Sequence, residues 1–195
     1  MDDKNAKLVT RLQEGDETAF EKLFELYKVK AVRTAYLLTN NAALAEDITQ
    51  EAFVQCYLKI KELRDPDQFK TWFFKILTRL AWKMSAKEKN VIPVENIFDA
   101  IAHQDTEQIE MDFIKREDAK KIMKLIDSLE QKQKTVILLY YYNGFSVGEI
   151  AKVVGCFEGT VKSRLHTARK NLKSSFTLQK ECIEEGAQHA IECKV

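Results

Sequence analysis

The sequence predicts an all-α protein with two small helical domains joined by a flexible acidic linker. Its 195 residues include only 6 Gly and 2 Pro, which permits long helices and disfavours a turn-rich β fold. Apolar residues recur at helical spacing on both sides of residues 95–112, a stretch with six acidic residues and neither Lys nor Arg. We therefore divide the chain into a first domain at 1–89, a linker at 90–112, a second domain at 113–176 and a C-terminal tail at 177–195.

The first domain is expected to contain three long helices after a short amphipathic segment at 4–14. Asp16 can cap the first long helix, whose apolar residues recur at helical spacing from Phe20 to Leu38. Asn40-Asn41 ends this helix and can cap the second, expected at 42–63. A polar, mostly acidic patch lies near the start of the second helix and consists of Glu46, Asp47, Gln50 and Glu51.

A third helix is expected at 68–89, because Pro66 interrupts the preceding pattern and Asp67 can serve as an N-cap. Its inward side is expected to consist of Phe69, Trp72, Phe73, Ile76, Leu80 and Met84. Basic residues lie between these positions, and interleaved basic and aromatic side chains can bind single-stranded DNA. The simpler interpretation, that the aromatic residues form core, suits most of them.

The linker and the second domain differ sharply in pattern. Helical periodicity fades over 90–112, where Pro93 prevents a continuous helix, and resumes at Phe113. Residues 134–142, KTVILLYYY, are too apolar for a surface helix and predict the central helix of a small bundle. Asn143-Gly144 then ends this central helix.

Residues 143–172 have the pattern of a helix-turn-helix motif. Ser146 and Glu149 form a capping-box sequence before a short apolar-faced helix, and Gly155 suits an abrupt helix end. A second helix is expected from 157 or 158, and its outward face is basic, with Lys162, Arg164, Arg169, Lys170 and Lys173. Residues 144–175 contain six Lys or Arg and two Glu, which gives this region a net charge of +4. This pattern favours major-groove DNA binding over an ordinary helical hairpin with a solvated basic face.

Composition argues against several other classes of protein. The charged start MDDKNAK lacks the apolar segment of a signal peptide, and no apolar run approaches the roughly 18 residues of a membrane span. The four cysteines lack CxxC spacing, so free thiols in a reducing cytoplasm are expected. Cys182, His189 and Cys193 are too irregularly spaced to predict a zinc site. The three histidines are dispersed, and we expect no catalysis, metal or cofactor.

Five motifs, in order, resemble the extracytoplasmic-function (ECF) class of bacterial RNA polymerase sigma factors, within the sigma-70 family. Three match region 2 of that family: GDETAFEKLFELY, AEDITQEAF and FKTWFFKIL. Two match region 4: SLEQKQKTVILLYYYNGFSVGEIA and EGTVKSRLHTARKNL. The resemblance extends from about Leu8 to Phe176, and five ordered motifs are far more specific than one helix-turn-helix.

The resemblance implies a cytoplasmic sigma factor, not an enzyme, that directs initiation at promoters with −10 and −35 elements. Its expected partners are core RNA polymerase (β′ clamp and β flap), promoter DNA and an anti-sigma factor, without membrane insertion. The expected polymerase contacts are Glu46, Asp47, Gln50 and Glu51. The expected −10 contacts are Arg64, Asp67, Phe69, Lys70, Trp72, Arg79 and Lys83. The expected −35 contacts are Glu158, Gly159, Thr160, Lys162, Ser163, Arg164, Arg169 and Lys173.

The chain departs from the family pattern at several positions. The family usually has Asn where Arg79 stands and Asp where Lys83 stands. Its turn usually reads Gly-Ile-Pro, whereas this chain has Gly-Cys-Phe at 155–157. Thr167 replaces a common Arg, and Glu130 replaces a common Pro. These differences leave the expected fold intact. They affect which promoter sequence we expect the protein to recognise.

Two other functions remain open at this point. A helix-turn-helix regulator that acts without polymerase accounts for residues 143–172 but not for the acidic patch or the aromatic third helix. A sigma-like adaptor that does not recognise promoters is favoured by Arg79 and Lys83.

Overall fold

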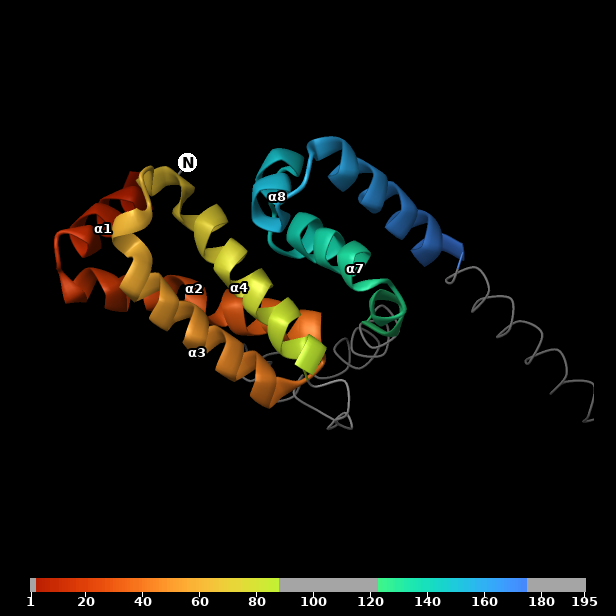
Figure 1. Ribbon diagram of the computed structural model, residues 1–195, viewed down its shortest axis with the longest axis horizontal. Coiled ribbons are helices and arrows are strands. Elements are labelled where there is room, and N and C mark those ends of the chain that lie inside the picture. Colours follow the sequence, from red (N-terminus) through yellow and green to blue (C-terminus); the bar gives the residue numbers. More distant parts are fainter. Residues whose placement is uncertain (1–2, 88–122, 175–195) are drawn as a thin grey trace, which may run out of the picture.

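The computed structural model describes residues 3–87 and 123–174, and within these ranges it contains helices and no strand. The all-α prediction is confirmed for this part of the chain. Figure 1 shows two groups of helices, one at each end of the described chain, with α4 between them. The predicted linker at 90–112 and tail at 177–195 lie outside the described residues.

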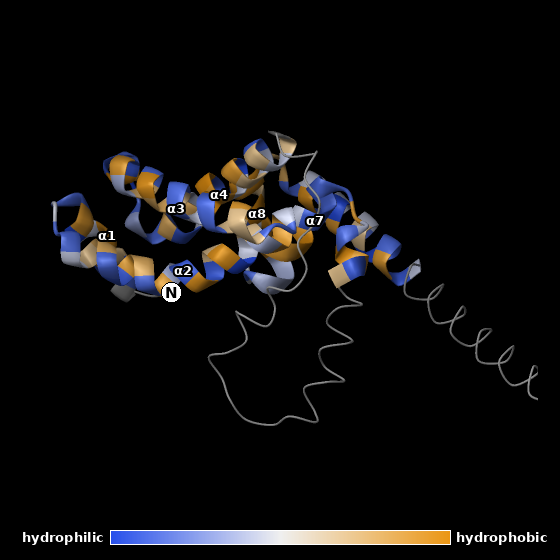
Figure 2. Ribbon diagram, turned by 90° about the horizontal axis from the view of Figure 1, so that it is seen from below, coloured by the Kyte–Doolittle hydropathy of each residue, from blue (hydrophilic) through white to orange (hydrophobic). Residues whose placement is uncertain are grey.

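The first group contains four α-helices and two short 3-10 helices. The α-helices are α1 (Asp3–Gln13), α2 (Glu17–Thr39), α3 (Ala42–Lys59) and α4 (Phe69–Lys87). The 3-10 helices η1 (Ile60–Glu62) and η2 (Pro66–Gln68) connect α3 to α4. Along each helix hydrophobic and hydrophilic residues alternate, as expected for helices that bury one face (Figure 2).

Two predicted caps are confirmed in this group. The Asp16 side chain accepts a hydrogen bond from the Thr18 N–H at the start of α2. Asn40 ends α2 in the left-handed conformation with φ 55, and the Asn41 side chain accepts from the Leu44 N–H at the start of α3. These short polar residues are favoured at helix ends because they satisfy backbone groups that the helix leaves unpaired.

Two predicted boundaries between α3 and α4 are wrong. α3 ends at Lys59 and is followed by the tighter η1, so it does not continue to 63. Asp67 caps no helix, because its own N–H donates to the side chain of Asp65, the N-cap of η2. The fixed backbone of Pro66 suits the first position of that short helix, and α4 begins only at Phe69.

An aromatic cluster forms the centre of the first group. Phe73 is fully buried, and its ring centroid lies 4.7 Å from that of Phe53 on α3 and 5.9 Å from that of Tyr27 on α2. The Phe69 ring lies parallel to Phe73 at 6.0 Å. Edge and offset contacts of this kind stabilise aromatic pairs beyond the area that they bury.

The second group is built around one very apolar helix. α7 (Gln131–Ile137) continues as the π-helical segment η3 (Leu138–Tyr142), and residues 134–139 are buried, as predicted for a central helix. α8 (Val147–Val154) and a last helix at residues 158–174 pack on it through Ile150, Val161 and Leu165.

α4 belongs to the core of both groups. Phe73 faces α2 and α3, whereas Phe74 lies against Phe145 of the second group, with ring centroids 5.3 Å apart. α4 accordingly contacts α8 as well as α3. The sequence pattern placed one apolar face on this helix and omitted Phe74 and Leu77, both fully buried. Phe74 faces Phe145, which follows far later in the chain, so the local pattern gives no sign of this second face.

A search of the described helices for a membrane-spanning segment finds none that is both long and apolar enough.

Replacement of Phe73 by Ala should lower the free energy of unfolding by about 3–5 kcal/mol, because a large side chain with four aromatic neighbours is removed from a closed core. Urea unfolding followed by tryptophan fluorescence measures this change, since both tryptophans lie on α4. Phe157→Ala is the matched control, as Phe157 is 86% exposed, and should change stability by no more than about 0.5 kcal/mol. Equal losses in the two variants would contradict the packing described for α4.

Candidate DNA and protein interfaces

The predicted helix-turn-helix is present, and a capping box fixes its start. The Ser146 N–H and hydroxyl both donate to the Glu149 carboxylate, at 2.8 and 2.7 Å, and the Glu149 N–H donates to the Ser146 hydroxyl at 3.3 Å. Gly155 ends α8 in the left-handed conformation with φ 71, and its N–H donates to the Ala151 carbonyl. Reciprocal capping and a glycine stop thus limit α8 to two turns before the chain reverses.

Gly148 on α8 lies beside the side chain of Glu158, the first residue of the last helix. A Cβ at this position would lie 3.1 Å from the Glu158 carboxylate. A contact that short requires the neighbouring side chain to move. Because Glu158 is exposed, its side chain has room to make that movement.

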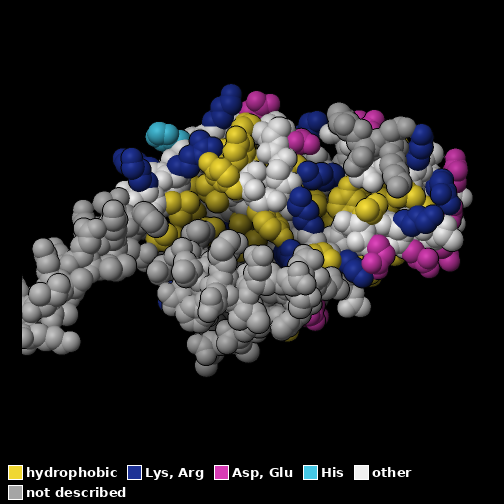
Figure 3. All heavy atoms as spheres, turned by 180° about the vertical axis from the view of Figure 1, so that it is seen from behind, with side chains coloured by type: hydrophobic (Ala, Val, Ile, Leu, Met, Phe, Trp, Pro, Cys, Tyr) yellow, Lys and Arg dark blue, Asp and Glu magenta, His cyan; other side chains and the backbone are white. Residues whose placement is uncertain are grey.

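The last helix presents most of the predicted −35 residues to solvent. Val161, Leu165 and Ala168 are buried against the rest of the group. The exposed members of the predicted set are Glu158, Gly159, Lys162, Ser163, Arg169 and Lys173, while Thr160 and Arg164 are half-buried. Figure 3 shows Lys and Arg side chains gathered at this end of the molecule. The structure therefore brings a basic, accessible helix face together, as major-groove binding requires.

Two of these arginines are already engaged within the domain. The Arg164 guanidinium lies 3.8 Å from the Cys156 sulfur in the turn. Arg169 donates from Nε to the Tyr141 hydroxyl at 2.9 Å and lies over the Tyr140 and Tyr141 rings at 5.5 and 5.6 Å. Arg169 thus joins the last helix to η3, a role that the basic pattern alone could not indicate.

The predicted −10 residues are spread along α4 and do not form one cluster. Arg64, Asp67, Arg79 and Lys83 are exposed, and Lys70 and Trp72 are half-buried. Arg79 and Lys83 follow Lys70 by nine and thirteen positions, which places them about 14 and 20 Å farther along the helix axis.

Phe69 does not present its side chain to solvent in this structure. It is 1% exposed, and its ring packs against Tyr27 and Phe73. The Phe69 ring, predicted from the sequence to contact the −10 element, is therefore too buried to touch DNA directly in this structure. Its side chain instead stabilises the start of α4. Apolar spacing alone could not separate an aromatic residue at the core from one at its edge.

Lys70 is held by the second group of helices. Its ammonium donates to the Asn143 carbonyl at 3.1 Å and lies 4.4 Å above the Phe145 ring. Burial lowers the pKa of Lys70, and the nearby charge of Lys30 lowers it further, whereas Glu149 acts in the opposite direction.

The predicted acidic patch is fully accessible on α3. Glu46, Asp47, Gln50 and Glu51 are all exposed, and Glu51 accepts a hydrogen bond from Gln55 at 2.8 Å. Glu46 and Gln50 also line a groove of about 1030 Å³ between α2 and α3. The four residues therefore form one surface, and this surface borders a depression.

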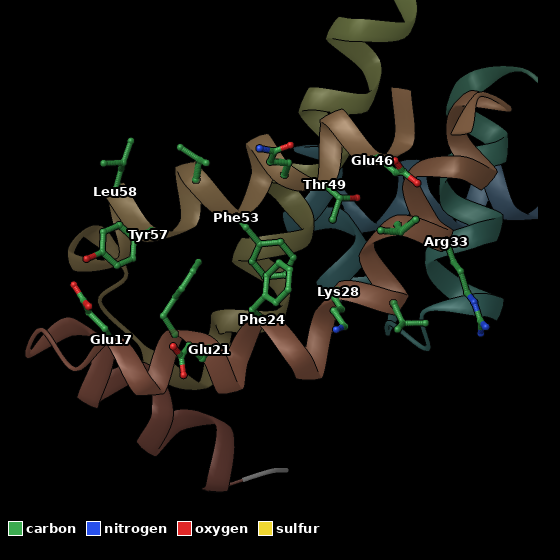
Figure 4. A pocket seen from close by; sticks show the side chains of 15 residues that line it. Glu17, Glu21, Phe24, Lys28, Arg33, Glu46, Thr49, Phe53, Tyr57 and Leu58 are labelled. Carbon is green, nitrogen blue, oxygen red and sulfur yellow. The ribbon is translucent and has the colours of Figure 1, made fainter. Parts of the chain in front are cut away.

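The groove is apolar along its floor and charged at its ends, and the helical periodicity of the sequence does not predict it. Phe24 and Phe53 lie within it, Tyr57 and Leu58 stand near Glu17 and Glu21, and Lys28 and Arg33 lie toward Glu46, as labelled in Figure 4. Leu58 and Val54 are exposed although they are large and apolar. Large apolar residues on the outward side of a helix are the feature of the sequence that indicates this groove, since exposed apolar patches mark interaction sites.

Thiols and metal-ligating groups add no site within the described residues. No group of three or more His, Cys, Asp or Glu side chains there is arranged to hold a metal ion. Cys56 is buried, and burial raises its pKa to about 12, so this thiol is unreactive at neutral pH. Cys182, His189 and Cys193 lie outside the described residues.

Family models match both groups of helices. The model for sigma-70 region 2 matches residues 23–90, and the model for sigma-70 region 4 matches residues 119–172.

Two curated proteins are similar over most of the chain. The ECF RNA polymerase sigma factor SigW of Bacillus subtilis is 31% identical over 178 residues, covering 86% of this chain and 94% of that protein. The ECF RNA polymerase sigma-E factor of Haemophilus influenzae is 30% identical over 177 residues, covering 86% and 92%.

Two solved structures share the fold. CnrH in complex with the cytosolic domain of CnrY has a TM-score of 0.70 and 20% identity, covering 90% of this chain and 99% of that one. The sigma factor RpoE in complex with the anti-sigma factor NepR from Bartonella quintana has a TM-score of 0.62 and 24% identity, covering 81% and 96%.

The capping box should make stability depend on pH. Burial raises the pKa of Glu149, but hydrogen bonds from Ser146 and the charges of Lys70 and Lys152 outweigh it, so the pKa falls below 4.5. A carboxyl with a lowered pKa stabilises the fold above pH 4.5 and loses this effect as the pH falls through its folded value. Wild type should therefore exceed Glu149→Gln in stability at pH 7, and the two should converge below pH 4.5.

Urea unfolding at a series of pH values measures this convergence. In a Ser146→Ala background the difference should be smaller at every pH, because the hydroxyl donor is gone. A difference that stays constant from pH 7 to pH 3 would contradict an ionised cap.

Proposed function

This chain belongs to the extracytoplasmic-function class of the sigma-70 family of RNA polymerase sigma factors, and we propose how its surfaces divide the work of promoter recognition. As a member of that family it binds core RNA polymerase and directs promoter-specific initiation of transcription. The observation that carries this conclusion is the match of region 2 and region 4 on one chain, in that order. The ECF sigma factor SigW, which is 31% identical, is matched over 94% of its own length.

Core polymerase is proposed to dock on α3 and the adjoining groove. The exposed carboxylates of Glu46, Asp47 and Glu51 offer negative charge beside the apolar floor formed by Phe24 and Phe53. An apolar groove with a charged rim is the usual site for an amphipathic partner helix. The apolar floor supplies most of the affinity, and the carboxylates select a basic partner and its orientation. This surface suits the β′ clamp helices expected from the family resemblance.

The last helix is proposed to read the −35 element. Its exposed face offers Lys162 and Ser163 to base edges or phosphates, and Arg164 can reach a guanine after leaving the Cys156 sulfur. Arg and Lys satisfy the O6 and N7 acceptors of guanine in the major groove. Arg169, tied to Tyr141, is better placed to orient the helix or to hold a phosphate.

The −10 element is proposed to bind along α4 and the turn before it. Arg64, Arg79 and Lys83 are exposed cations suited to phosphates, and Trp72 is a half-buried ring suited to stacking. Extraction of a base from the duplex costs a few kcal/mol of stacking, so these contacts must offset it. Lys70 completes the surface once it is free of Asn143.

A cytoplasmic site of action and an anti-sigma partner complete the proposal. Transcription takes place in the cytoplasm of bacteria, and the chain is proposed to act there as a polymerase subunit without catalysis of its own. The solved relatives were captured with CnrY and with the anti-sigma factor NepR. A comparable partner is proposed for this chain, and the β flap is the proposed site for its second domain.

The experiment is run-off transcription by purified core polymerase, with and without the protein, on the DNA upstream of its own gene. Wild type should give a specific transcript, and Asp47→Lys/Glu51→Lys should need at least about tenfold more protein, because it turns attraction to a basic partner into repulsion. The control Glu14→Lys/Glu62→Lys makes the same change in net charge at exposed positions away from this patch and should behave as wild type.

Other outcomes would favour the other functions. If the protein binds duplex DNA but gives no polymerase-dependent transcript from any genomic template, it is a DNA-binding regulator that acts without polymerase. Polymerase binding without transcription would indicate an adaptor. Equal activity of the two double variants would exclude α3 as the docking surface.

Arg164→Ala should weaken binding to −35 duplex by about 1–3 kcal/mol if the side chain reads a base. Fluorescence anisotropy with the holoenzyme, on promoter duplexes with single base changes in the −35 element, measures the loss and its sequence dependence. Thr167→Ala, an exposed change on the same helix, is the control. An equal loss on every duplex would assign Arg164 to a phosphate instead.

A further inference from the structure

One large apolar side chain of the helix-turn-helix stands almost wholly in solvent. Phe157 is 86% exposed, more than any other large apolar residue in the described part of the chain. Its neighbour Cys156 is half-buried and packs against the core of the second group, so only Phe157 of this pair points away from the protein. The −35 contacts expected from the sequence begin at Glu158 and give Phe157 no role.

Phe157 is the N-cap of the last helix. Its carbonyl accepts hydrogen bonds from the N–H groups of Thr160, at 2.9 Å, and Val161, at 3.2 Å. An N-cap is usually Ser, Thr, Asp or Asn, because the side-chain oxygen accepts from a backbone N–H that the helix leaves unpaired. Phenylalanine has no such acceptor, and it replaces the proline that is usual in the family at this position. A small polar residue would therefore start this helix better.

Burial does not explain the phenylalanine either. A single exposed apolar residue is common on protein surfaces and needs no explanation by itself. At Phe157, however, the preference for polar N-caps and the preference for burial of large aromatic side chains are broken at the same position. A position that breaks local rules within a well-packed fold is expected at a functional site.

Phe157 lies at the end of the helix that meets base edges in this class of motif. In a helix-turn-helix the second helix enters the major groove, and the residues at its N-terminal end contact the bases. The exposed Lys162 and Ser163 follow on the same helix. A cation at that distance can hold a phosphate while the ring meets a base pair.

The surroundings of Phe157 leave room for a base pair. Gly159 is exposed, and a Cβ at this position would meet no atom within 4 Å. The Glu158 carboxylate, which would repel DNA, lies beside Gly148 on α8. In the major groove the base edges present hydrogen-bond donors and acceptors, and thymine adds one apolar group, its C5-methyl. That methyl group is the counterpart that an apolar ring can recognise.

We propose that Phe157 is a specificity-determining residue that contacts the C5-methyl group of a thymine in the −35 element. The proposal rests on the proposed function and deepens it, because it assigns one base preference to one side chain. The contact removes the methyl group and part of the ring from water, which favours binding without any hydrogen bond. A shorter side chain at this position would leave the methyl group in water.

Replacement of thymine by uracil tests this contact, because uracil keeps every hydrogen bond of the pair with adenine and lacks only the methyl group. Each thymine of the −35 element, on either strand, is replaced singly in duplexes of the promoter that run-off transcription identifies. Binding of the holoenzyme is measured by fluorescence anisotropy. One thymine, or two neighbouring ones, should lose about three- to fourfold in affinity on replacement, as expected for one methyl group removed from an apolar contact.

A variant of Phe157 assigns the lost affinity to its ring. Phe157→Ala should bind the thymine promoter at least about threefold more weakly and should no longer distinguish thymine from uracil at the sensitive position. Leu26→Ala is the matched control, because Leu26 is apolar and 57% exposed, and it should keep the full difference. The urea midpoint of Phe157→Ala should equal that of wild type, which separates a DNA contact from a role in folding.

The proposal would be overturned if wild type bound every uracil duplex as tightly as the thymine promoter, or if Phe157→Ala kept the preference for thymine. An equal loss in Phe157→Ala on thymine and uracil duplexes would also overturn it and would place the ring against polymerase or the DNA backbone. Failure of the sigma-factor function has a different signature, since wild type would then give neither a run-off transcript nor promoter-specific binding.

Discussion

The arrangement of this protein depends on the packing of α4 through two different faces. Phe73 completes the aromatic core of the first domain, and Phe74, the next residue, contacts Phe145 of the second. Adjacent positions on a helix point about 100° apart, so one helix can serve two cores when apolar residues occupy consecutive positions. The place of the helix-turn-helix relative to the first domain follows from this shared helix, as does the burial of the turn at 143–145.

The interaction surfaces follow from what this shared helix covers and leaves open. α2 and α3 use their inner sides to bury Phe73, which leaves the groove over Phe24 and Phe53 accessible for a partner. The last helix keeps Lys162, Lys170 and Lys173 exposed to solvent. The start of α4 is engaged by the second domain through Lys70. The same contacts that assemble the protein thus determine which surfaces are available first.

A modest charge is sufficient for DNA recognition in this setting. Residues 144–175 carry a net charge of +4, and some of these charges already make contacts within the domain, such as that between Arg169 and Tyr141. A regulator that binds DNA alone depends on many phosphate contacts. A polymerase subunit shares that electrostatic work with a much larger enzyme, so its last helix needs to select a site more than to hold it.

Local chemistry is what the sequence by itself determined. Helix periodicity, the caps at Asp16 and Asn41, and the capping box of Ser146 and Glu149 depend on residues within four positions of each other, and each was predictable. The resemblance to ECF sigma factors rests on five motifs and their order along the chain, which the sequence also contains in full. The error in the cap before α4 arose because the turn contains two acidic residues on either side of Pro66, and the backbone geometry of the turn makes Asp65 the cap.

Tertiary structure alone decided which of the predicted residues are available. The Asn143 carbonyl meets Lys30 and Lys70 across 113 and 73 positions of the chain, and no local pattern encodes such a meeting. Burial of Phe69, the second apolar face of α4 and the groove between α2 and α3 have the same origin. A period of 3.6 residues shows that a face is apolar, whereas the element that covers it is set by the packing of the whole chain.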